Sequence, residues 1–280
     1  MKTLLLLPIL AVLAACSSSQ SEEVSTVQAA SAIINGQDVA STDFVATSTV
    51  ALVAPNAEGR IESFCSGVLI SPDLVLTAAH CVIARDDFYY VSFGTTLPQS
   101  LTDENVVSVS TQMTHDYFDV LPPKVAGGLA TTINDIAVVK LQKSAPSGFF
   151  PAHILAPKVK FVAGENATLS GFGIINEETQ EVKPVMQGAE VPVVKLANQF
   201  LVLDQTQSGA CKGDSGGPAF MTSPQGPVLV GISRGSHGGA GDCHHFSEYT
   251  FVPKFKVFLI RAARMLEAET PVFVTLESNL

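Results

Sequence analysis

A serine set among glycines is the strongest candidate nucleophile in the chain. It lies in Gly213-Asp214-Ser215-Gly216-Gly217-Pro218. A serine hydroxyl is a weak nucleophile, so it needs a base beside it and hydrogen-bond donors for the oxyanion that develops on the attacked carbonyl. Glycine at 213 lets the backbone turn so that the N–H groups of Gly213 and Ser215 can point at one oxygen. The segment therefore predicts nucleophilic catalysis with an oxyanion hole.

The base and the group that orients it must come from other segments. His80, in Thr77-Ala78-Ala79-His80-Cys81, directly follows an apolar strand, and imidazole is the usual base beside a catalytic serine. Asp135 begins the apolar stretch Asp135-Ile136-Ala137-Val138-Val139. A carboxylate buried at such a place can hold the imidazole N–H and stabilise its cation. The chain order is histidine, aspartate, serine.

The elements that must position these residues are short strands. Apolar or alternating runs, broken by Gly, Pro, Asn and Asp, predict an antiparallel barrel or sandwich protein. The predicted strands are Thr49–Val53, Gly67–Ile70, Leu74–Thr77, Tyr89–Phe93, Ile136–Leu141, Ala167–Gly171, Val228–Ile232 and Tyr249–Val252. One helix is predicted over 253–266, because Phe255, Phe258, Leu259, Ala262, Ala263 and Leu266 recur on one face.

Two readings of Ser215 follow from the residues. Gly-x-Ser-x-Gly also fits the nucleophile turn of α/β-hydrolases, which would make the protein an esterase. That turn leads straight into a helix, which Pro218 opposes, and it needs the order serine, acid, histidine. The longer string 210–218 (ACKGDSGGP) instead resembles the serine loop of the chymotrypsin/trypsin family. The string 77–81 (TAAHC) and the stretch 134–141 (NDIAVVKL) resemble that family's histidine and aspartate motifs.

The resemblance covers about residues 33–266 and implies an all-β fold of two six-stranded antiparallel Greek-key barrels with a C-terminal helix. It places the first barrel at about 33–150, the second at about 151–252, the helix at 253–266 and a tail at 267–280. It implies a serine endopeptidase that uses His80, Asp135 and Ser215 and needs no cofactor. Departures from the family pattern are Gly171-Phe172-Gly173, Ser233-Arg234-Gly235 and the absence of tryptophan, which affect the expected substrate subsites more than the chemistry.

The resemblance also implies further roles. The freed amine of Ile33, in Ile33-Ile34-Asn35-Gly36, is expected to pair with Asp214 after a cut behind Ala32, so that the protein is made as a zymogen. The specificity pocket is expected to have a neutral base and walls, with cleavage after neutral apolar residues. The loop 236–246 does not align with the family, so a charge from Asp242 or Glu248 could enter the pocket. The residues expected in the pocket are Gly209, Ala210, Ser233, Gly235 and, approximately, Ser247.

The N-terminus predicts export. Lys2 precedes an apolar run, Leu4 to Leu13, that is too short to span a bilayer, so residues 1–15 are expected to be a signal peptide. The run ends Leu13-Ala14-Ala15-Cys16, which resembles the bacterial lipobox, so Cys16 is expected to be lipidated and 16–32 to form a polar tether. An ordinary signal cleavage, with no role for Cys16, is the alternative. The lipoprotein reading predicts a membrane-anchored protein, on the outer membrane of a bacterium.

The number of cysteines is consistent with an exported protein that has disulfides. The chain has five cysteines, and a lipidated Cys16 would leave four for two disulfides. None of the four lies at C-x-x-C spacing, so no metal site is expected. Sequence proximity and the family resemblance favour Cys65–Cys81 and Cys211–Cys243 over the other two pairings.

Composition narrows the partners. The chain of 280 residues is long enough for two small cores, and its net charge of −10 without any Lys/Arg cluster argues against a nucleic-acid partner. Protein or peptide substrates are expected, with the membrane contacted only through the Cys16 lipid. A catalytically dead homologue that acts as a surface binding protein is the rival from another functional class. Such proteins usually lose a triad residue or the oxyanion glycine, and this chain keeps both.

Overall fold

The computed structural model describes residues 33–83, 89–123, 130–157, 164–237 and 242–275. The expected signal peptide (1–15), Cys16 and the tether (16–32) lie outside the described residues, as do 238–241 and 276–280. Within the described part, no helix has both the length and the apolar character needed to cross a membrane.

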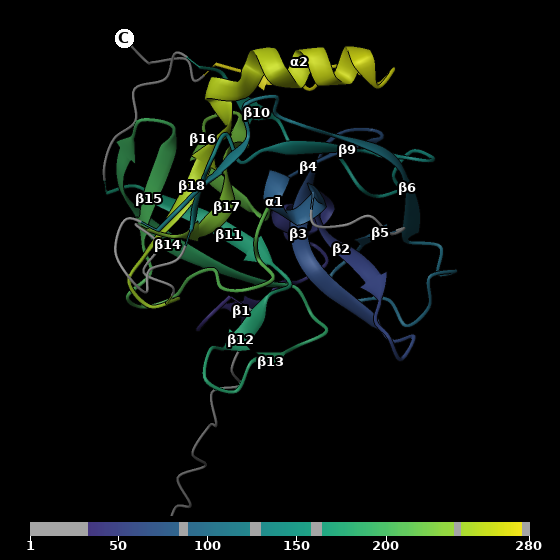
Figure 1. Ribbon diagram of the computed structural model, residues 1–280, viewed down its shortest axis with the longest axis horizontal. Helices are drawn as coiled ribbons and strands as arrows, with labels where there is room; N and C mark the ends of the chain where they lie inside the picture. Colours follow the sequence, from purple (N-terminus) through teal and green to yellow (C-terminus); the bar gives the residue numbers. More distant parts are fainter. Residues whose placement is uncertain (1–32, 84–88, 124–129, 158–163, 238–241, 276–280) are drawn as a thin grey trace, which may run out of the picture.

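The first barrel is a closed antiparallel sheet of six strands, drawn in blue to teal in Figure 1. Its apolar runs are buried on both faces or alternate, as expected for strands that enclose a core. In order around the barrel these strands are β2 (Thr49–Pro55), β3 (Ile61–Ser71), β4 (Leu74–Thr77), β9 (Ala137–Leu141), β6 (Val106–Thr114) and β5 (Tyr90–Phe93).

The second barrel closes in the same way, because β16 pairs with both β11 and β17. Its six strands in order are β16 (Pro218–Ser223), β11 (Asn166–Gly171), β14 (Gln187–Ala197), β15 (Phe200–Asp204), β18 (Phe246–Phe251) and β17 (Gly226–Ser236). The expected fold of two six-stranded antiparallel barrels is confirmed.

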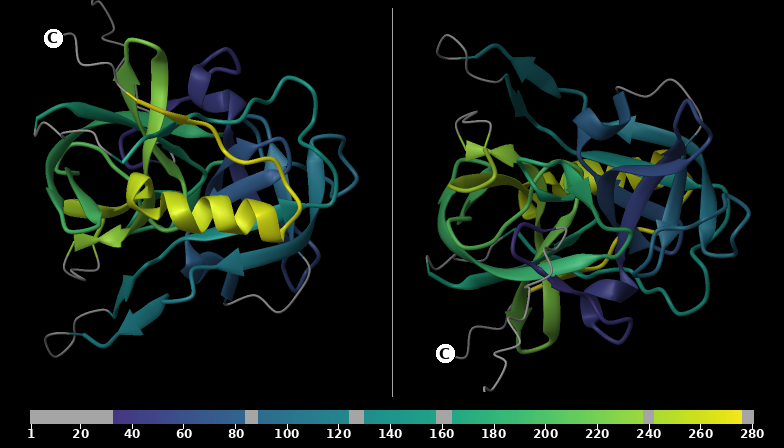
Figure 2. Two further views of the ribbon diagram at one scale, coloured as in Figure 1. Left: turned by 90° about the horizontal axis from the view of Figure 1, so that it is seen from above. Right: turned by 90° about the horizontal axis from the view of Figure 1, so that it is seen from below.

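Short strands extend this framework. β1 (Gln37–Asp38) pairs with β14, so the start of the described chain lies on the second barrel and not on the first. β10 (Ile154–Leu155) and β19 (Phe273–Val274) add parallel pairings beside β17. Two hairpins stand apart from the barrels: β7 (Asp119–Leu121) with β8 (Thr131–Ile133), and β12 (Ile174–Asn176) with β13 (Glu181–Val182). The β7–β8 hairpin projects from the body of the molecule (Figure 2).

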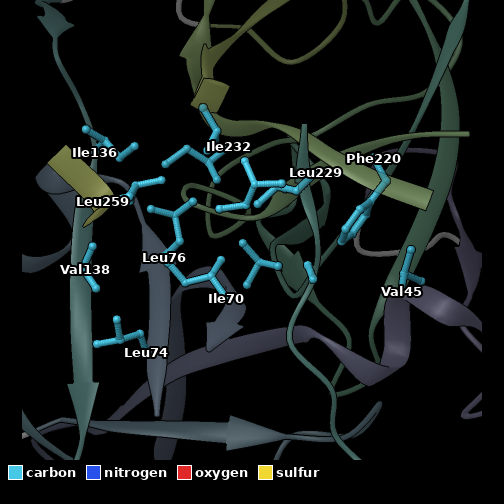
Figure 3. Close-up of a cluster of buried hydrophobic side chains, with 14 of the residues drawn as sticks. Val45, Ile70, Leu74, Leu76, Ile136, Val138, Phe220, Leu229, Ile232 and Leu259 are labelled. Atoms are coloured by element: carbon cyan, nitrogen blue, oxygen red, sulfur yellow. The ribbon is translucent and has the colours of Figure 1, made fainter. Parts of the chain in front are cut away.

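One apolar core joins the two barrels. Figure 3 shows Leu76 and Val138 of the first barrel in the same cluster as Leu229 and Ile232 of the second, with Leu259 of the C-terminal helix packed onto them. The helix α2 (Lys256–Met265) lies across one end of both barrels (Figure 1). Because these side chains share one cluster, the two barrels and the helix pack on a common core.

The helices differ in detail from the prediction. Residues Val252–Phe255 form a 3₁₀ turn that contains Pro253, and the α-helix begins at Lys256. A tighter first turn is common at helix N-termini, and proline suits it because those N–H groups have no partner inside the helix. The structure also contains a helix that the sequence analysis missed, α1 (Ala79–Ile83), which carries His80. Its five residues are too few to show an apolar period.

Candidate active site

His80 and Asp135 meet at one end of the first barrel. His80 lies in α1 directly after β4, and Asp135 directly precedes β9, the neighbour of β4. His80 Nδ1 is 2.7 Å from Asp135 Oδ2, and the His80 backbone N–H donates to Asp135 Oδ1 at 3.0 Å. The two contacts fix the imidazole ring so that Nε2 faces away from the carboxylate. The predicted base and orienting acid are therefore brought together.

Asp135 is buried, and it accepts a third hydrogen bond from a residue that the sequence analysis missed. Thr132 Oγ1 donates to Asp135 Oδ2 at 2.7 Å, and Thr250 Oγ1 of β18 donates to the Asp135 carbonyl at 3.0 Å. Burial by itself would raise the pKa of Asp135, but the hydrogen bonds and charge of His80 and the Thr132 hydroxyl outweigh it and lower that pKa. Asp135 is thus ionised at neutral pH and can stabilise an imidazolium.

The loop with Ser215 packs directly onto the first barrel. A Cβ on Gly216 would lie 2.0 Å from Thr77 Oγ1 and 2.8 Å from the Ala78 backbone nitrogen, and its φ is +80°, so only glycine fits. The Ser66 N–H of β3 donates to the Ser215 carbonyl at 2.9 Å. That close approach brings the candidate nucleophile to the start of α1, where His80 lies.

One sulfur atom lies close to both Ser215 and His80. Cys81 Sγ lies 3.6 Å from the Ser215 carbonyl oxygen and 3.8 Å from His80 Nε2. Among the described residues the Ser215 hydroxyl makes no hydrogen bond, and catalytic contacts are often long before substrate binds. His80, Asp135 and Ser215 therefore share one site between the barrels.

The same loop presents two backbone donors. Gly213 has φ +93°, and its carbonyl accepts a hydrogen bond from Ser66 Oγ at 3.1 Å, which holds the peptide that follows. Within the described part of the chain, neither the Gly213 nor the Ser215 N–H has an acceptor. Two such donors on one turn can receive a developing oxyanion.

Both expected disulfides are confirmed. Cys65–Cys81 joins β3 to α1 and so holds the helix that carries His80. Cys211–Cys243 joins the serine loop to the segment before β18. In the described residues, the groups that bring possible metal ligands together are one residue each with a disulfide pair, and disulfide sulfurs are not thiolates.

A cavity of about 160 Å³ opens beside Ser215. Four of the five expected pocket residues line it, together with both expected disulfide cysteines of this loop and with Asp242. Gly209 does not line it, because the Gln205 side chain lies on that glycine: a Cβ at Gly209 would be 2.3 Å from Gln205 Cδ. The lining residues are Gln205, Ala210, Cys211, Lys212, Ser215, Ser233, Gly235, Ser236, Asp242, Cys243 and Ser247.

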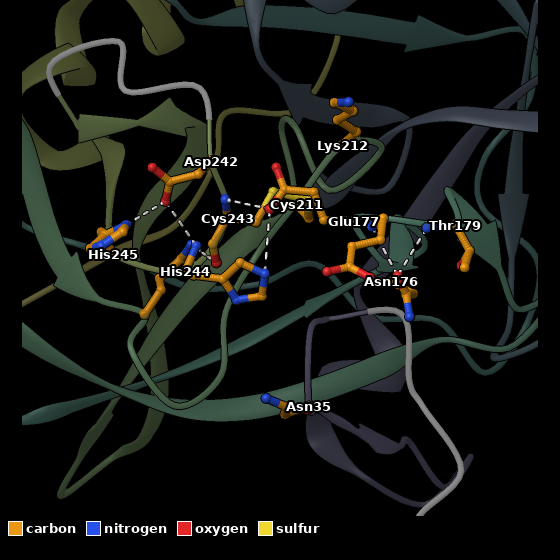
Figure 4. A network of polar contacts seen from close by, with 12 residues as sticks. Asn35, Asn176, Glu177, Thr179, Cys211, Lys212, Asp242, Cys243, His244 and His245 are labelled. Atoms are coloured by element: carbon orange, nitrogen blue, oxygen red, sulfur yellow. Dashed lines mark hydrogen bonds and ion pairs between the residues drawn. A yellow bond between two sulfur atoms is a disulfide. The ribbon is translucent and has the colours of Figure 1, made fainter.

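The polar side chains that line the cavity differ in the hydrogen bonds that they make. Gln205 is buried and its amide is fully used, since it donates to the Ala210 carbonyl at 3.0 Å and accepts from the Ala210 N–H at 2.8 Å. The buried Ser247 hydroxyl has no hydrogen-bond partner among the described residues. Asp242 Oδ1 lies 2.8 Å from His245 Nδ1, as drawn in Figure 4. The hydrogen bond from His245 lowers the pKa of Asp242. Glu248 is not in the cavity.

Asp214 is buried behind the serine loop. Its carboxylate accepts the N–H groups of Gly173 at 2.8 Å and Cys211 at 2.9 Å. Burial raises the pKa of Asp214 to about 7, although those two hydrogen bonds oppose it. Ile33 and Ile34 are buried too, and Ile34 exchanges backbone hydrogen bonds with Gly209.

Several residues of this site carried no signal in the sequence. Thr132, Gln205 and Ser66 are ordinary polar residues in or beside strands, and only their contacts reveal a role. The nearest clue was Ser66, which follows Cys65 directly. Arg234 was noticed only as a departure from the family pattern.

Known proteins are similar over most of this chain. The trypsin family model matches residues 33–259. Brachyurin of Leptuca pugilator is 26% identical over 204 residues, which cover 67% of this chain and 84% of brachyurin. Kallikrein-12 of Homo sapiens is 28% identical over 204 residues (68% of this chain, 77% of the kallikrein). Trypsin epsilon of Drosophila erecta is 27% identical over 221 residues (72% and 78%). With its two barrels and both disulfides, the chain belongs to the trypsin family and is a serine-type endopeptidase.

Proposed function

We propose that this endopeptidase cleaves through an acyl-enzyme on Ser215. His80 serves as base and then acid, Asp135 orients it, and the Gly213 and Ser215 N–H groups form the oxyanion hole. The observation that supports this most directly is the pair of contacts from Asp135 to the His80 ring and backbone, with Ser215 beside the same helix.

These groups carry out the bond changes and proton transfers of both half-reactions. Ser215 Oγ attacks the carbonyl carbon while His80 Nε2 takes the hydroxyl proton, and the oxyanion accepts the two N–H bonds. The C–N bond then breaks, and His80 gives that proton to the leaving amine. Water attacks the acyl-enzyme with His80 again as base, and breakage of the ester bond returns the hydroxyl of Ser215 and releases the new carboxyl end.

A serine-reactive fluorophosphonate probe tests this assignment. The wild-type protein should be labelled, and Ser215→Ala or His80→Ala should lose labelling and several orders of magnitude in turnover while the fold is kept. Ser144→Ala, which removes an exposed hydroxyl, is the matched control and should label normally. Near-wild-type peptidase activity in Ser215→Ala would overturn the triad. A folded wild-type protein that neither labels nor cleaves would instead be the inactive binding homologue.

For the specificity we propose cleavage after neutral residues. Ala210, Gln205 and Ser247 line the cavity, are buried and carry no charge. An unpaired Lys or Arg side chain would lose hydration there without compensation. Asp242 is the one carboxylate among the residues that line the cavity, and its Oδ1 contacts His245 Nδ1.

A peptide library measured on wild type and Asp242→Asn separates these contributions. Neutral residues should dominate before the cut in both proteins. Preferential cleavage after Arg or Lys in the wild type would contradict the proposal, and its loss in Asp242→Asn would assign that preference to Asp242.

We also propose that activation requires a cut before Ile33. The supporting observation is the position of Ile34, which packs with Ile174 and Cys211, next to the two N–H groups that hold Asp214. A free Ile33 amine would give the buried carboxylate a counter-ion, and a buried ion pair is costly to break. N-terminal sequencing of the active form should find Ile33 first. Full activity in a chain that still begins at Cys16 would rule this out.

The proposed cut before Ile33 would also change where the protein is located. We propose that the uncut chain is a bacterial lipoprotein held by Cys16 and that activation releases the catalytic domain, since neither disulfide crosses the cut. Cys16→Ser should move the uncut protein from the membrane to the soluble fraction after export. An unchanged distribution would contradict lipidation.

A further inference from the structure

A buried ion pair lies behind the orienting acid. Arg234 of β17 has a side chain that is 6% exposed, and it pairs with Glu248 of β18, which is 10% exposed. The guanidinium also lies over the Phe200 ring, 4.2 Å from its centroid, and His237 Nδ1 is 2.6 Å from Glu248 Oε1. A buried ion pair is weak evidence for a stabilising role, because the lost hydration of both charges offsets their attraction. The other contacts of Arg234 therefore bear on its role.

The guanidinium reaches from the second barrel to the residue that touches Asp135. Arg234 Nε donates to Thr132 Oγ1 at 3.0 Å, and Arg234 Nη2 donates to the Thr132 carbonyl. A hydroxyl has one proton. Because Thr132 Oγ1 accepts from Arg234, its own proton is left for Asp135 Oδ2, 2.7 Å away. The same carboxylate oxygen faces His80 Nδ1.

Thr132 needs such an anchor. It lies in β8, which pairs with β7 and with no barrel strand among the described residues. The two bonds from Arg234 tie this hairpin to β17, the strand that also contributes Ser233 and Gly235 to the cavity beside Ser215. The hairpin that supports the acid and the wall of the substrate cavity are thereby held to one another.

We propose that Arg234 is a positioning residue for the peptidase reaction: it holds and orients Thr132 so that the Thr132 hydroxyl donates to Asp135. The proposal rests on the assignment of His80, Asp135 and Ser215 as the triad. Arg234 is not a catalytic residue, since its guanidinium is turned toward Thr132 and Glu248, and it does not line the cavity.

The electrostatic consequence has a definite sign. The charged groups that face Asp135 in the described structure are His80 from α1 and Arg234 from β17, with Glu248 from β18 and His237 behind the arginine. The positive charge and the hydroxyl proton both draw electron density from the carboxylate and weaken its hold on an imidazolium. Loss of either should therefore favour protonated His80 and move the acid limb of the kcat/KM profile to higher pH.

The first test compares Thr132→Val with Thr132→Ser on one neutral peptide substrate. Valine keeps the shape and removes the hydroxyl, and serine restores it. Thr132→Val should lower kcat about tenfold, as expected for loss of one hydrogen bond to a charged group, with KM within about twofold. Its acid limb should move upward by about half a pH unit. Thr132→Ser should recover most of the kcat and the wild-type limb.

The second test removes the arginine without leaving a buried unpaired charge. The double variant Arg234→Met/Glu248→Gln should reproduce the kcat loss of Thr132→Val, and adding Thr132→Val to it should cost little more, because both changes break the same link. Arg261→Met is the matched control. It removes a guanidinium that also pairs with a carboxylate, Asp116, and lies over a ring, Phe258, but has no contact with Thr132. Its kcat and pH profile should stay at wild-type values.

An NMR signal distinguishes positioning of Asp135 from a purely structural role of Thr132, which would leave that signal unchanged. In the Ser215→Ala background, the signal of the proton between His80 Nδ1 and Asp135 should shift in Thr132→Val and return in Thr132→Ser. A folded Thr132→Val protein with wild-type kcat, acid limb and resonance would overturn the proposal, as would a double variant whose loss adds fully to that of Thr132→Val. If Ser215→Ala alone retains activity, the triad assignment fails instead, which is a separate result.

Discussion

At the scale of single residues, the site depends on where carboxylates are buried and on what satisfies them. Asp135 and Asp214 are both fully buried, yet their pKa values move in opposite directions. Asp135 has an imidazole and a hydroxyl beside it, which outweigh burial. Asp214 has two backbone N–H donors but no cation among the described residues, and burial prevails. Of these two carboxylates, Asp214 is therefore the one without a counter-ion among the described residues.

This contrast predicts a pH-dependent stability of the precursor. The pKa of Asp214 is raised from its ordinary value to about 7, so the folded chain binds that proton more tightly than the unfolded chain. The contribution is fully present below about pH 4 and is lost as pH rises through 7; it amounts to at most about 4 kcal/mol. Relative to Asp214→Asn, the uncut wild type should therefore lose stability between pH 4 and 7 in urea unfolding. A difference that stays constant with pH would contradict this.

The chain beginning at Ile33 supplies the matched comparison. If its amine pairs with Asp214, the ionised form becomes the favoured one, and the loss between pH 4 and 7 should shrink or reverse. The same urea series on the cut protein measures it.

At the scale of elements, the two disulfides hold different functional parts. Cys65–Cys81, with a sequence separation of 16, fixes α1 and His80 against β3. Cys211–Cys243, with a separation of 32 and drawn in Figure 4, joins the serine loop to a cysteine that also lines the cavity. Similar covalent bonds therefore constrain the proposed base in one case and the proposed substrate pocket in the other.

Paired alanine variants should separate these roles. Loss of Cys65–Cys81 is expected to cost about 3 kcal/mol of stability and loss of Cys211–Cys243 slightly more, because the longer loop gains more entropy on unfolding. The first pair should mainly lower kcat, since it frees the helix of His80. The second should mainly raise KM, since it frees the pocket wall. Steady-state kinetics at a temperature where both variants are folded decides it, and equal effects on both parameters in both variants would refute the assignment.

At the scale of the whole molecule, the proposed triad depends on both barrels. Its acid belongs to the first barrel, but Thr250 and Arg234 of the second barrel support it directly or through Thr132. The apolar cluster that joins the barrels includes Leu259 of α2, which is fully buried. The geometry of the proposed site therefore depends on the contact between the barrels and not on either barrel alone.

A single cooperative unfolding transition is expected for this reason. Leu259→Ala should destabilise the protein by about 3 kcal/mol, the typical loss when a buried leucine is truncated. Val257→Ala on the exposed side of the same helix should change stability by less than about 0.5 kcal/mol. Because Leu259 belongs to the apolar cluster that joins the barrels, denaturant unfolding of Leu259→Ala should remain one transition, whether followed by circular dichroism or by tyrosine fluorescence. Two separate transitions would show that the barrels unfold independently.

The sequence by itself determined the family and the order of the candidate triad, because the motifs that carry them are short contiguous strings. The disulfide pairing was favoured by sequence proximity and by the family resemblance, and the structure confirms it. A turn that needs glycine at 213 and 216, or a cysteine beside His80, is a local requirement that the residues state directly. Five of the eight strands expected from apolar runs begin or end at the predicted residue in the structure. The barrel strands β6, β14, β15 and β16 were not among those expected.

Only the tertiary structure decided which side chains converge from distant segments. Gln205 covers Gly209 and takes its place at the cavity, β1 joins the second barrel, and Arg234 reaches Thr132 across 102 positions of sequence. Such contacts depend on how the two barrels pack, and packing is set by many apolar contacts at once. No short string encodes them, because a polar residue next to a strand has the same local signature whether it faces solvent or supports a buried carboxylate.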